Sequence, residues 1–256
     1  MALTPEDRRR FEKMARDYDA VAPYFVPPYD LLQQEMIRVS GLAESVNPLV
    51  VDLGAGGARF LERALETVPG ARCFWVDSSD AFRAAAERRL ERFGGSVAYV
   101  SSRLEDPWED ELPKAPDFIF SMSAIHHLES AEKHRLTERC FAALRPGGWF
   151  INTDEMRPED DDAYYRSLLY WVRHVDAAEV PEELAAEAAG WRASFERWKA
   201  RNIENFGAPK QIGDDLHESV VVQTGFLRQA GFTDVDCFVK FHLWAMTGGR
   251  KPAEAD

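Results

Sequence analysis

The chain has 256 residues with a formal net charge of −13, and 45% of its residues are hydrophobic. This length and composition suit one large α/β domain with a sizeable core. The negative charge disfavours a nucleic-acid partner, because phosphates are bound by clustered Lys and Arg, and the tight basic cluster Arg8 to Arg10 stands among acidic residues. No apolar run reaches the about 18 residues of a membrane-spanning helix.

The N-terminal residues lack the apolar core of a secretion signal. Three cysteines, Cys73, Cys140 and Cys237, lie far apart in apolar surroundings. This pattern predicts buried free thiols in a reducing compartment. We therefore expect a cytoplasmic protein with no membrane association.

Two helices are predicted at the N-terminus, with a proline-rich segment between them. Residues 5–20 carry apolar side chains at helical spacing. Residues 22–29 contain three prolines, which predict an irregular segment instead of a regular helix. A second helix is expected over residues 30–39, ending near Gly41. Residues 1–44 are thus expected to form an N-terminal helical cap.

From residue 48 onward, short apolar segments alternate with helical ones. Strands are expected over residues 49–53, 71–76, 96–101, 117–121 and 149–153. Helices are expected between them, over residues 58–67, 79–93 and 130–144. This alternation predicts a parallel sheet with helices on both faces.

The alternation stops after the fifth predicted strand. Residues 155–210 show helical and aromatic signals without a strand, and they are too long for a plain connection. We interpret them as a helical lid insertion. A helix over 218–229 follows, and then two tightly joined strands, 233–240 and 242–247, which we expect to form an antiparallel pair at the sheet edge.

A glycine-rich turn, Gly54-Ala55-Gly56, follows the first strand and Asp52. Glycines let the backbone approach a ligand closely, and the helix start behind them offers free N–H groups. Asp77 closes the second strand about twenty residues later, where an acidic residue accepts hydrogen bonds from ribose hydroxyls. The alternative is a helix cap for the segment that begins near Ser79. Turn and acid together predict a nucleotide-type cofactor.

Four ordered motifs resemble those of the class I S-adenosylmethionine-dependent methyltransferases. They are VVDLGAGGA at 50–58, FWVDSS at 74–79, DFIFSMSAIHHL at 117–128 and LRPGGWF at 144–150. The resemblance implies S-adenosylmethionine as cofactor and S-adenosylhomocysteine as product. It implies a Rossmann-like α/β fold: a doubly wound, mostly parallel seven-stranded sheet with an antiparallel edge strand, plus N-terminal helices and a helical lid. The cofactor domain would comprise residues 45–154 and 211–250, with 155–210 as the lid.

The resemblance also implies cofactor contacts at the ends of the first four strands. The turn Gly54-Ala55-Gly56 would pass under the amino-acid end of the cofactor, and Asp52 would orient the turn and bind the ammonium group through water. Asp77 would take the ribose hydroxyls. The remaining implied contacts are Ser78, Arg103 and Leu104 at the adenine and Ser121 at the methionine part.

Two positions depart from the family pattern. Ala58 replaces the third glycine of the turn, and Arg103 stands where the adenine loop customarily has an acid. Either Glu105 or Asp106 contacts the adenine amine from a shifted position, or backbone groups around Leu104 do so alone.

His126 and His127 follow the fourth strand, on the rim where substrate meets cofactor in this fold. A histidine there could take a proton from an acceptor hydroxyl or ammonium group. The position next to Leu128 favours His127 as the base, with His126 near the substrate. The resemblance suggests an N-terminal tyrosine as its partner, for which Tyr18 is a catalytic candidate and Tyr24 a substrate-binding one. The alternative is that the histidines cap the loop or fill space under the lid.

Asp154 and Glu155 follow the fifth strand, at the edge where open α/β sheets bind ligands. They could hold a cationic substrate or act as a base, or they could be solvated acids that cap the next helix. The other histidines show no metal-ligand spacing, so we expect no bound metal; they are His134, His174, His217 and His242.

The leading hypothesis is methyl transfer from S-adenosylmethionine to an O or N atom of a small molecule. Three alternatives remain: a tRNA-modifying or carboxy-S-adenosylmethionine synthase-like enzyme, a nicotinamide dehydrogenase, and a non-catalytic binding protein on the same fold. The negative charge counts against RNA, and the intact turn with Asp77 counts against a non-catalytic protein. Helical caps with exposed aromatic side chains often pair, so a homodimer is also considered.

Overall fold

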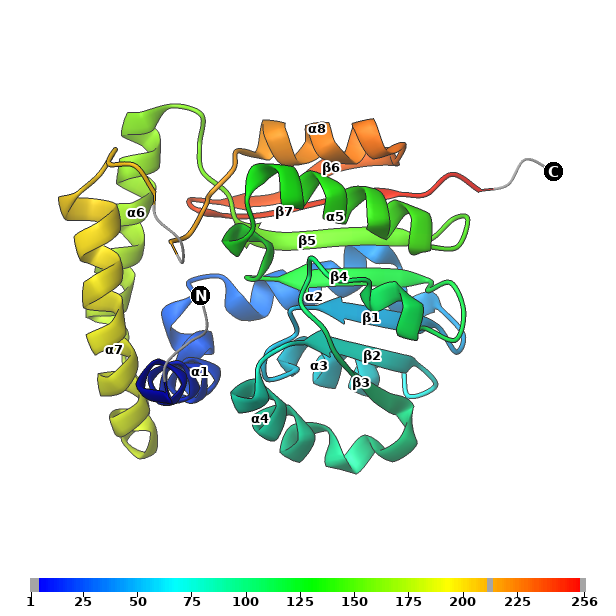
Figure 1. The fold of residues 1–256 in the computed structure, drawn as a ribbon, viewed down its shortest axis with the longest axis horizontal. Coiled ribbons are helices and arrows are strands. Elements are labelled where there is room, and N and C mark those ends of the chain that lie inside the picture. The colour runs from blue at the N-terminus through cyan, green and yellow to red at the C-terminus, as the bar shows by residue number, and fades with distance from the viewer. Residues whose placement is uncertain (1–4, 211–213, 254–256) are drawn as a thin grey trace.

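The computed structural model describes residues 5–210 and 214–253, in which one seven-stranded sheet is flanked by helices (Figure 1). The strands are β1 (Leu49–Leu53), β2 (Arg72–Asp77), β3 (Val97–Ser101), β4 (Phe118–Met122), β5 (Trp149–Glu155), β6 (Thr233–Phe241) and β7 (Trp244–Arg250). Their order is β3-β2-β1-β4-β5-β7-β6. The first five strands pair in parallel, and β7 pairs antiparallel with both β5 and β6. The predicted α/β fold class is therefore confirmed.

The helices fall near their predicted positions. They are α1 (Pro5–Phe25), α2 (Tyr29–Ser40), α3 (Arg59–Thr67), α4 (Asp80–Leu90), α5 (Ser130–Ala143), α6 (Asp161–Ala177), α7 (Ala185–Lys199) and α8 (Val220–Ala230). Short turns of tighter helix join several of them, and a π-helical turn, Ala200–Glu204, continues α7.

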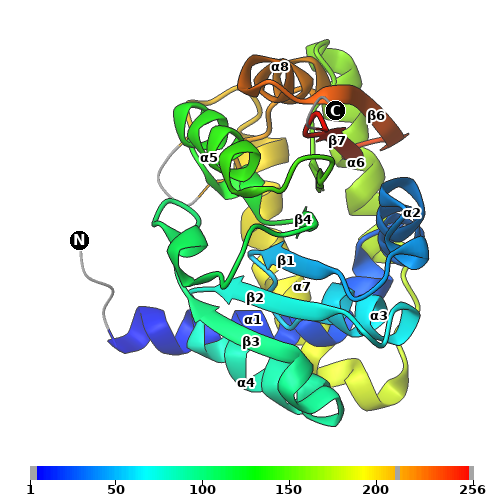
Figure 2. The same ribbon diagram turned by 90° about the vertical axis from the view of Figure 1, so that its right-hand side faces the viewer.

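The sheet is buried on both faces, which explains its continuous apolar strands. On β1, Val50 belongs to the core that packs under α2, α3 and α4, whereas Leu49 and Val51 belong to the core under α5 and α8. Figure 2 shows α5 on one side of the sheet and α2 and α3 on the other. The alternation of side chains along each strand thus divides the core into two layers.

The proline-rich segment differs from expectation, because α1 continues through Pro23 to Phe25. A proline inside a helix has no N–H to donate to the carbonyl four residues earlier, which here is Asp19. That carbonyl instead accepts two hydrogen bonds from the Arg59 guanidinium, at 2.9 Å from Nε and 2.6 Å from Nη2. A side chain from α3 therefore replaces the lost helix bond, and α1 extends over the glycine turn.

Helices α1, α6 and α7 stand across the carboxyl ends of the parallel strands (Figure 1). An aromatic cluster joins them, with Phe25 stacked on Trp191 at 4.7 Å between ring centroids. Trp171 of α6 lies at its centre and donates its indole N–H to the Phe25 carbonyl at 2.8 Å. This layer encloses the end of the sheet at which ligands bind in open α/β folds.

No helix within the described residues is long and apolar enough to cross a membrane. Cys73 and Cys140 are buried free thiols, as expected, whereas the free thiol Cys237 is half-buried.

Candidate functional site

The turn after β1 lines a cavity of about 80 Å³ beneath α1. Tyr18 and Asp19 of α1 close it from above, and Tyr29 lines it as well. Ligand pockets usually measure about 300–1,000 Å³, so α1 fills much of the space that a nucleoside would need. Binding of such a ligand therefore requires side chains of α1 to move.

Close contacts explain the glycines of the turn. Gly54 has φ +66°, and a Cβ there would lie 2.4 Å from the Cβ of Ala124. A Cβ at Gly57 would lie 1.8 Å from Oδ1 of Asp19. The other oxygen of this carboxylate, Oδ2, pairs with Nη2 of Arg89 at 2.8 Å. Gly54 and Gly57 thus have no room for a side chain, and the backbone of the turn faces the cavity.

Two carboxylates stand near the ends of β1 and β2: Asp52 lines the cavity, and Asp77 bonds the backbone of the turn that lines it. Asp52 is buried and its Oδ1 has no hydrogen-bond partner among the described residues. Burial raises the pKa of Asp52, and the charge of Asp77 adds to the effect. Asp77 accepts hydrogen bonds from the backbone N–H of Gly56 at 2.9 Å and of Ser79 at 2.7 Å. Burial raises the pKa of Asp77, against the effect of these amides.

Asp77 is not the cap of α4, because Ser79 fills that role. The Ser79 hydroxyl caps α4 by accepting from the N–H of Phe82. Asp77 thus remains beside the glycine turn, with lone pairs available to a ligand.

The residues predicted to contact the adenine and methionine parts of the cofactor range from exposed to fully buried. Arg103 points to the surface and pairs with Glu105, and Ser78 is exposed. Leu104 is half-buried near the turn, where its Cδ1 lies 3.8 Å from a Cβ built at Gly54. Ser121 is fully buried and donates its hydroxyl to the Leu53 carbonyl at 2.8 Å, which ties β4 to β1.

Of the two candidate tyrosines, Tyr18 reaches the cavity. Burial raises the pKa of Tyr18, as do nearby Tyr29 and Glu155, while the hydroxyl of Ser123 opposes the shift. Tyr24 packs against the aromatic cluster of the helical layer, and its carbonyl hydrogen-bonds to His174 at 2.9 Å. Tyr29, Ser123 and Phe82 line the cavity without having been predicted from the sequence.

A second group of polar side chains lies beyond Tyr18, at the ends of β4 and β5. His126 is buried, with Nδ1 2.6 Å from Oδ1 of Asp154, and its backbone N–H donates to Oδ2 of the same carboxylate at 2.8 Å. Asp154 is the penultimate residue of β5 and is 1% exposed, so it is not a solvated loop acid. The carboxylate thus fixes both the loop and the imidazole ring.

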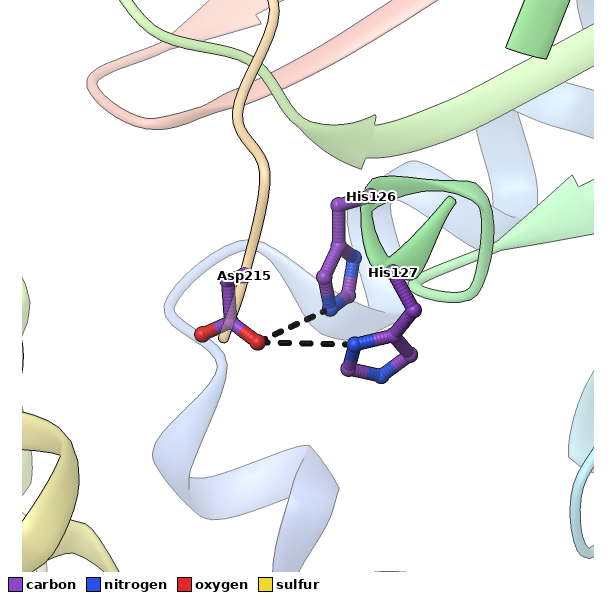
Figure 3. Close-up of side chains that lie close together, drawn as sticks. All are labelled: His126, His127 and Asp215. Atoms are coloured by element: carbon purple, nitrogen blue, oxygen red, sulfur yellow. Dashed lines mark ion pairs between the residues drawn. The ribbon is translucent and has the colours of Figure 1, made fainter. Parts of the chain in front are cut away.

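Asp215 approaches both histidines from the segment before α8 (Figure 3). One oxygen, Oδ1, lies 3.7 Å from Nε2 of His126 and 3.5 Å from Nδ1 of His127. The other oxygen accepts the indole N–H of Trp198 at 2.8 Å. The helical layer therefore contributes to the site through α7.

His217 and Glu155 form a further ionisable pair near Asp215. Nε2 of His217 is 2.9 Å from Oε2 of Glu155, and Nδ1 is 2.7 Å from the hydroxyl of Tyr164. Both side chains are buried. The ligand atoms of Glu155, Asp215 and His217 lie within 4.8 Å of one another, as do those of His126, His127 and Asp215.

The charges of this cluster shift its pKa values strongly. Burial alone would lower the pKa of His126, but Asp154, Glu155 and Asp215 raise it to about 10. Burial would raise the pKa of Asp154, but His126 lowers it. Burial would likewise raise the pKa of Asp215, yet the histidines hold it at about 2. Buried acids thus draw positive charge into the site.

The pKa of His127 is lowered, whereas that of His126 is raised. The neighbouring His126 cation lowers the pKa of His127 to about 4, and desolvation adds to the effect. The side chain is 60% exposed, so solvent screens part of this repulsion. His127 is the neutral member of the pair at neutral pH.

Sequence reasoning missed Asp215 and His217. Their segment has no helical or strand periodicity, and it reaches β4 only through the fold, where the N–H of Leu216 donates to the His126 carbonyl at 2.8 Å. A sequence signal was nevertheless present, because Asp215 and His217 are alternate residues in a chain with six histidines.

Comparisons with known proteins agree with this geometry. A family model described as "Methyltransferase domain" matches residues 51–150. Trans-aconitate 2-methyltransferase of Paracidovorax citrulli is 32% identical over 99 residues, which are 39% of this chain and 35% of that protein. Carboxy-S-adenosyl-L-methionine synthase of Yersinia enterocolitica is 25% identical over 64% of this chain and 60% of that protein. The chain thus spans less than two thirds of the length of either relative.

Solved structures share the fold. An O-methyltransferase family protein from Burkholderia thailandensis superposes with a TM-score of 0.58 at 18% identity, over 88% of this chain and 57% of that one. The glycine turn, Asp77 and the strands β2, β3 and β4 lie within the matched region. Residues 51–150 thus match a methyltransferase domain, and the chain shares its fold with a solved O-methyltransferase family protein.

Proposed function

We propose that the protein transfers a methyl group from S-adenosylmethionine to an O or N atom of a small molecule. The observation that carries this proposal is the cavity between α1 and the glycine turn of the matched region, which is lined by the buried carboxylate of Asp52 with its unpartnered Oδ1. Asp77 lies next to this cavity, where it accepts the N–H of the lining residue Gly56. S-Adenosylhomocysteine would be the product.

The chemistry of the cavity fits this cofactor. The free Oδ1 of Asp52 suits the cofactor's ammonium group, directly or through water. The oxygens of Asp77 retain lone pairs for the two ribose hydroxyls. The turn of Gly54 to Gly57 lines the cavity, so its backbone would lie against the bound ligand. A bound sulfonium supplies an electrophilic methyl group, and the protein has to align the acceptor and exclude water.

We propose that the acceptor binds between Tyr18 and the histidine pair, since Tyr18 lines the cofactor cavity and its pKa responds to both Asp154 and Glu155. His127 is the neutral histidine and is the candidate proton acceptor, with Tyr18 orienting the substrate. His126 already holds a proton at neutral pH, which suits it less to a role as a base.

Residues 1–44 and 155–210 would act together as a cover over both sites. Tyr18 and Asp19 come from α1. Trp198 of α7 donates to Asp215, and the hydroxyl of Tyr164 on α6 hydrogen-bonds to His217. Movement of α1 would admit the cofactor and its closure would exclude water.

A second candidate function follows from the match to carboxy-S-adenosyl-L-methionine synthase. In that case a modified form of the cofactor would be the product, instead of a methylated acceptor. Mass spectrometry separates the two outcomes, because a carboxylated sulfonium compound and a methylated metabolite differ in mass and in origin.

The test is a metabolite screen with S-adenosylmethionine that carries a deuterated methyl group. We expect a metabolite labelled with three deuterons together with S-adenosylhomocysteine, formed by the wild-type protein and lost in Asp77→Ala. Accumulation of a carboxylated sulfonium would instead support the second candidate. Absence of any labelled or modified product across metabolite pools would contradict both.

A further inference from the structure

We propose that His126, His127 and Asp215 bind one divalent transition-metal ion at the acceptor end of the site. The imidazole nitrogens Nε2 of His126 and Nδ1 of His127 would be ligands together with Oδ1 of Asp215. This binding site is separate from the cofactor cavity and does not depend on the identity of the cofactor.

The separations between the three atoms carry the inference. Nε2 of His126 and Nδ1 of His127 both point at the same oxygen of Asp215, at 3.7 and 3.5 Å (Figure 3). Both distances exceed those of an N–H···O hydrogen bond, which are about 2.7–3.2 Å. Two ligands bound tetrahedrally at about 2.0–2.2 Å from one ion lie about 3.3–3.6 Å apart. The 3.5 Å separation lies within this range and the 3.7 Å separation lies just above it, so both are nearer to the spacing of atoms that share an ion than to that of a hydrogen bond.

The contacts behind these atoms are those expected around metal ligands. Nδ1 of His126 is 2.6 Å from the Asp154 carboxylate, so it donates its proton there and directs Nε2 at Asp215, where the ion would replace the second proton that His126 carries without metal. A carboxylate behind a histidine ligand fixes the tautomer and makes the imidazole more basic. Oδ2 of Asp215 is held by the indole N–H of Trp198, which leaves Oδ1 for the ion.

The charge of the surroundings also favours a cation. Asp154 and Glu155 are 1% and 7% exposed. Glu155 lies within 4.8 Å of Asp215, and Asp154 lies behind the ring of His126. Buried carboxylates need a compensating positive charge, which a divalent ion supplies more fully than a single imidazolium. Two imidazoles and one carboxylate form a donor set typical of Zn²⁺ and Fe²⁺ sites with an open position.

An open position would face the acceptor. If the proposed methyl transfer is correct, an acceptor oxygen bound to the ion would lose its proton more easily, so a hydroxyl compound would be the preferred substrate class. This second step rests on the proposed function, whereas ion binding does not.

The experiment is a titration of chelator-treated protein with Co²⁺, followed by visible d–d absorption. We expect the wild-type protein to bind one Co²⁺ per chain. Loss of a ligand in Asp215→Asn should weaken binding about 100-fold or more. Loss of the supporting carboxylate in Asp154→Asn should weaken it about 10–100-fold.

Two further variants control for loss of the fold and for non-specific binding of Co²⁺. His127→Gln removes a ligand whose side chain is 60% exposed, so its fold should be retained while Co²⁺ affinity falls about tenfold or more. His134→Gln removes a histidine from a separate histidine–carboxylate pair, with Glu138 on α5, and should bind Co²⁺ like the wild type.

The proposal is overturned if folded wild-type protein binds no Co²⁺, or if His127→Gln and Asp215→Asn bind it as tightly as the wild type. Thermal stabilisation by S-adenosylhomocysteine is measured in the same samples. Retained stabilisation with no Co²⁺ binding would reject the metal site alone, and Co²⁺ binding without stabilisation would reject the cofactor alone.

Discussion

Replacing Gly54 by alanine is expected to lower the free energy of unfolding by about 2–5 kcal/mol and to abolish stabilisation by S-adenosylhomocysteine. Left-handed backbone at φ +66° costs a residue with a Cβ roughly 1–2 kcal/mol. The new Cβ would also lie 2.4 Å from the Cβ of Ala124, and forcing atoms into packed space costs about 1–3 kcal/mol more. Denaturant-induced unfolding measures the first effect and a thermal shift the second.

Alanine variants of two other glycines separate the cost of a left-handed backbone from the cost of a steric clash. Gly207 has φ +81° with no atom within 4 Å of a Cβ, so Gly207→Ala should show the strain alone, about 1–2 kcal/mol. Gly95 has open space and no positive φ, so Gly95→Ala should change stability by less than about 0.5 kcal/mol. If Gly54→Ala were no more destabilising than Gly207→Ala and still bound the ligand, the tight approach of the turn to Ala124 would be wrong.

Replacing Trp171 by alanine is expected to cost about 3–5 kcal/mol, as for other large aromatic residues removed from a core. Its ring contacts those of Trp191, Phe195, Trp198 and Trp244, at centroid distances of 4.6 to 6.4 Å. Its indole N–H bonds the Phe25 carbonyl, so the truncation would also leave that buried acceptor without its partner. Because this residue joins α1, α6, α7 and β7, we expect the helical layer to loosen and cofactor affinity to fall.

Phe206 provides the matched control, since it is an aromatic residue of the same insertion but is 36% exposed. Phe206→Ala should cost less than about 1 kcal/mol. Both variants are compared by chemical denaturation and by the affinity for S-adenosylhomocysteine. Equal stability of the two variants would show that the aromatic cluster does not hold the layer in place.

The sheet could be predicted from the sequence because its central parallel strands, β1, β4 and β5, are almost wholly buried and are rich in apolar residues. Leu49–Leu53 is an example, with five buried residues that end at the glycine turn. The helix through Pro23 could not be predicted, since the rule against internal proline is local. The compensating donor, Arg59, lies on α3 and reaches Asp19 only in the folded chain.

The site residues also divide into those that the strand pattern predicts and those that only the folded chain brings together. Asp52 and Asp77 were predictable because strand ends in a parallel sheet meet at one edge, so their positions follow from the strand pattern. The cluster around Asp215 was not, because it depends on a non-periodic segment that crosses the sheet edge to meet His126. The expectation of no metal rested on sequence spacing, which does not register residues brought together from β4, β5 and the segment before α8.

The most direct test of the central claim is thermal unfolding with S-adenosylhomocysteine, with NAD in parallel, for the wild type and Asp77→Asn. A ligand at 100 times its dissociation constant stabilises the folded state by about 2.7 kcal/mol. We predict that S-adenosylhomocysteine raises the melting temperature of the wild-type protein, that NAD does not, and that Asp77→Asn loses most of the shift. A wild-type protein that S-adenosylhomocysteine leaves unchanged, or a shift that survives Asp77→Asn in full, would contradict the assignment of this cavity.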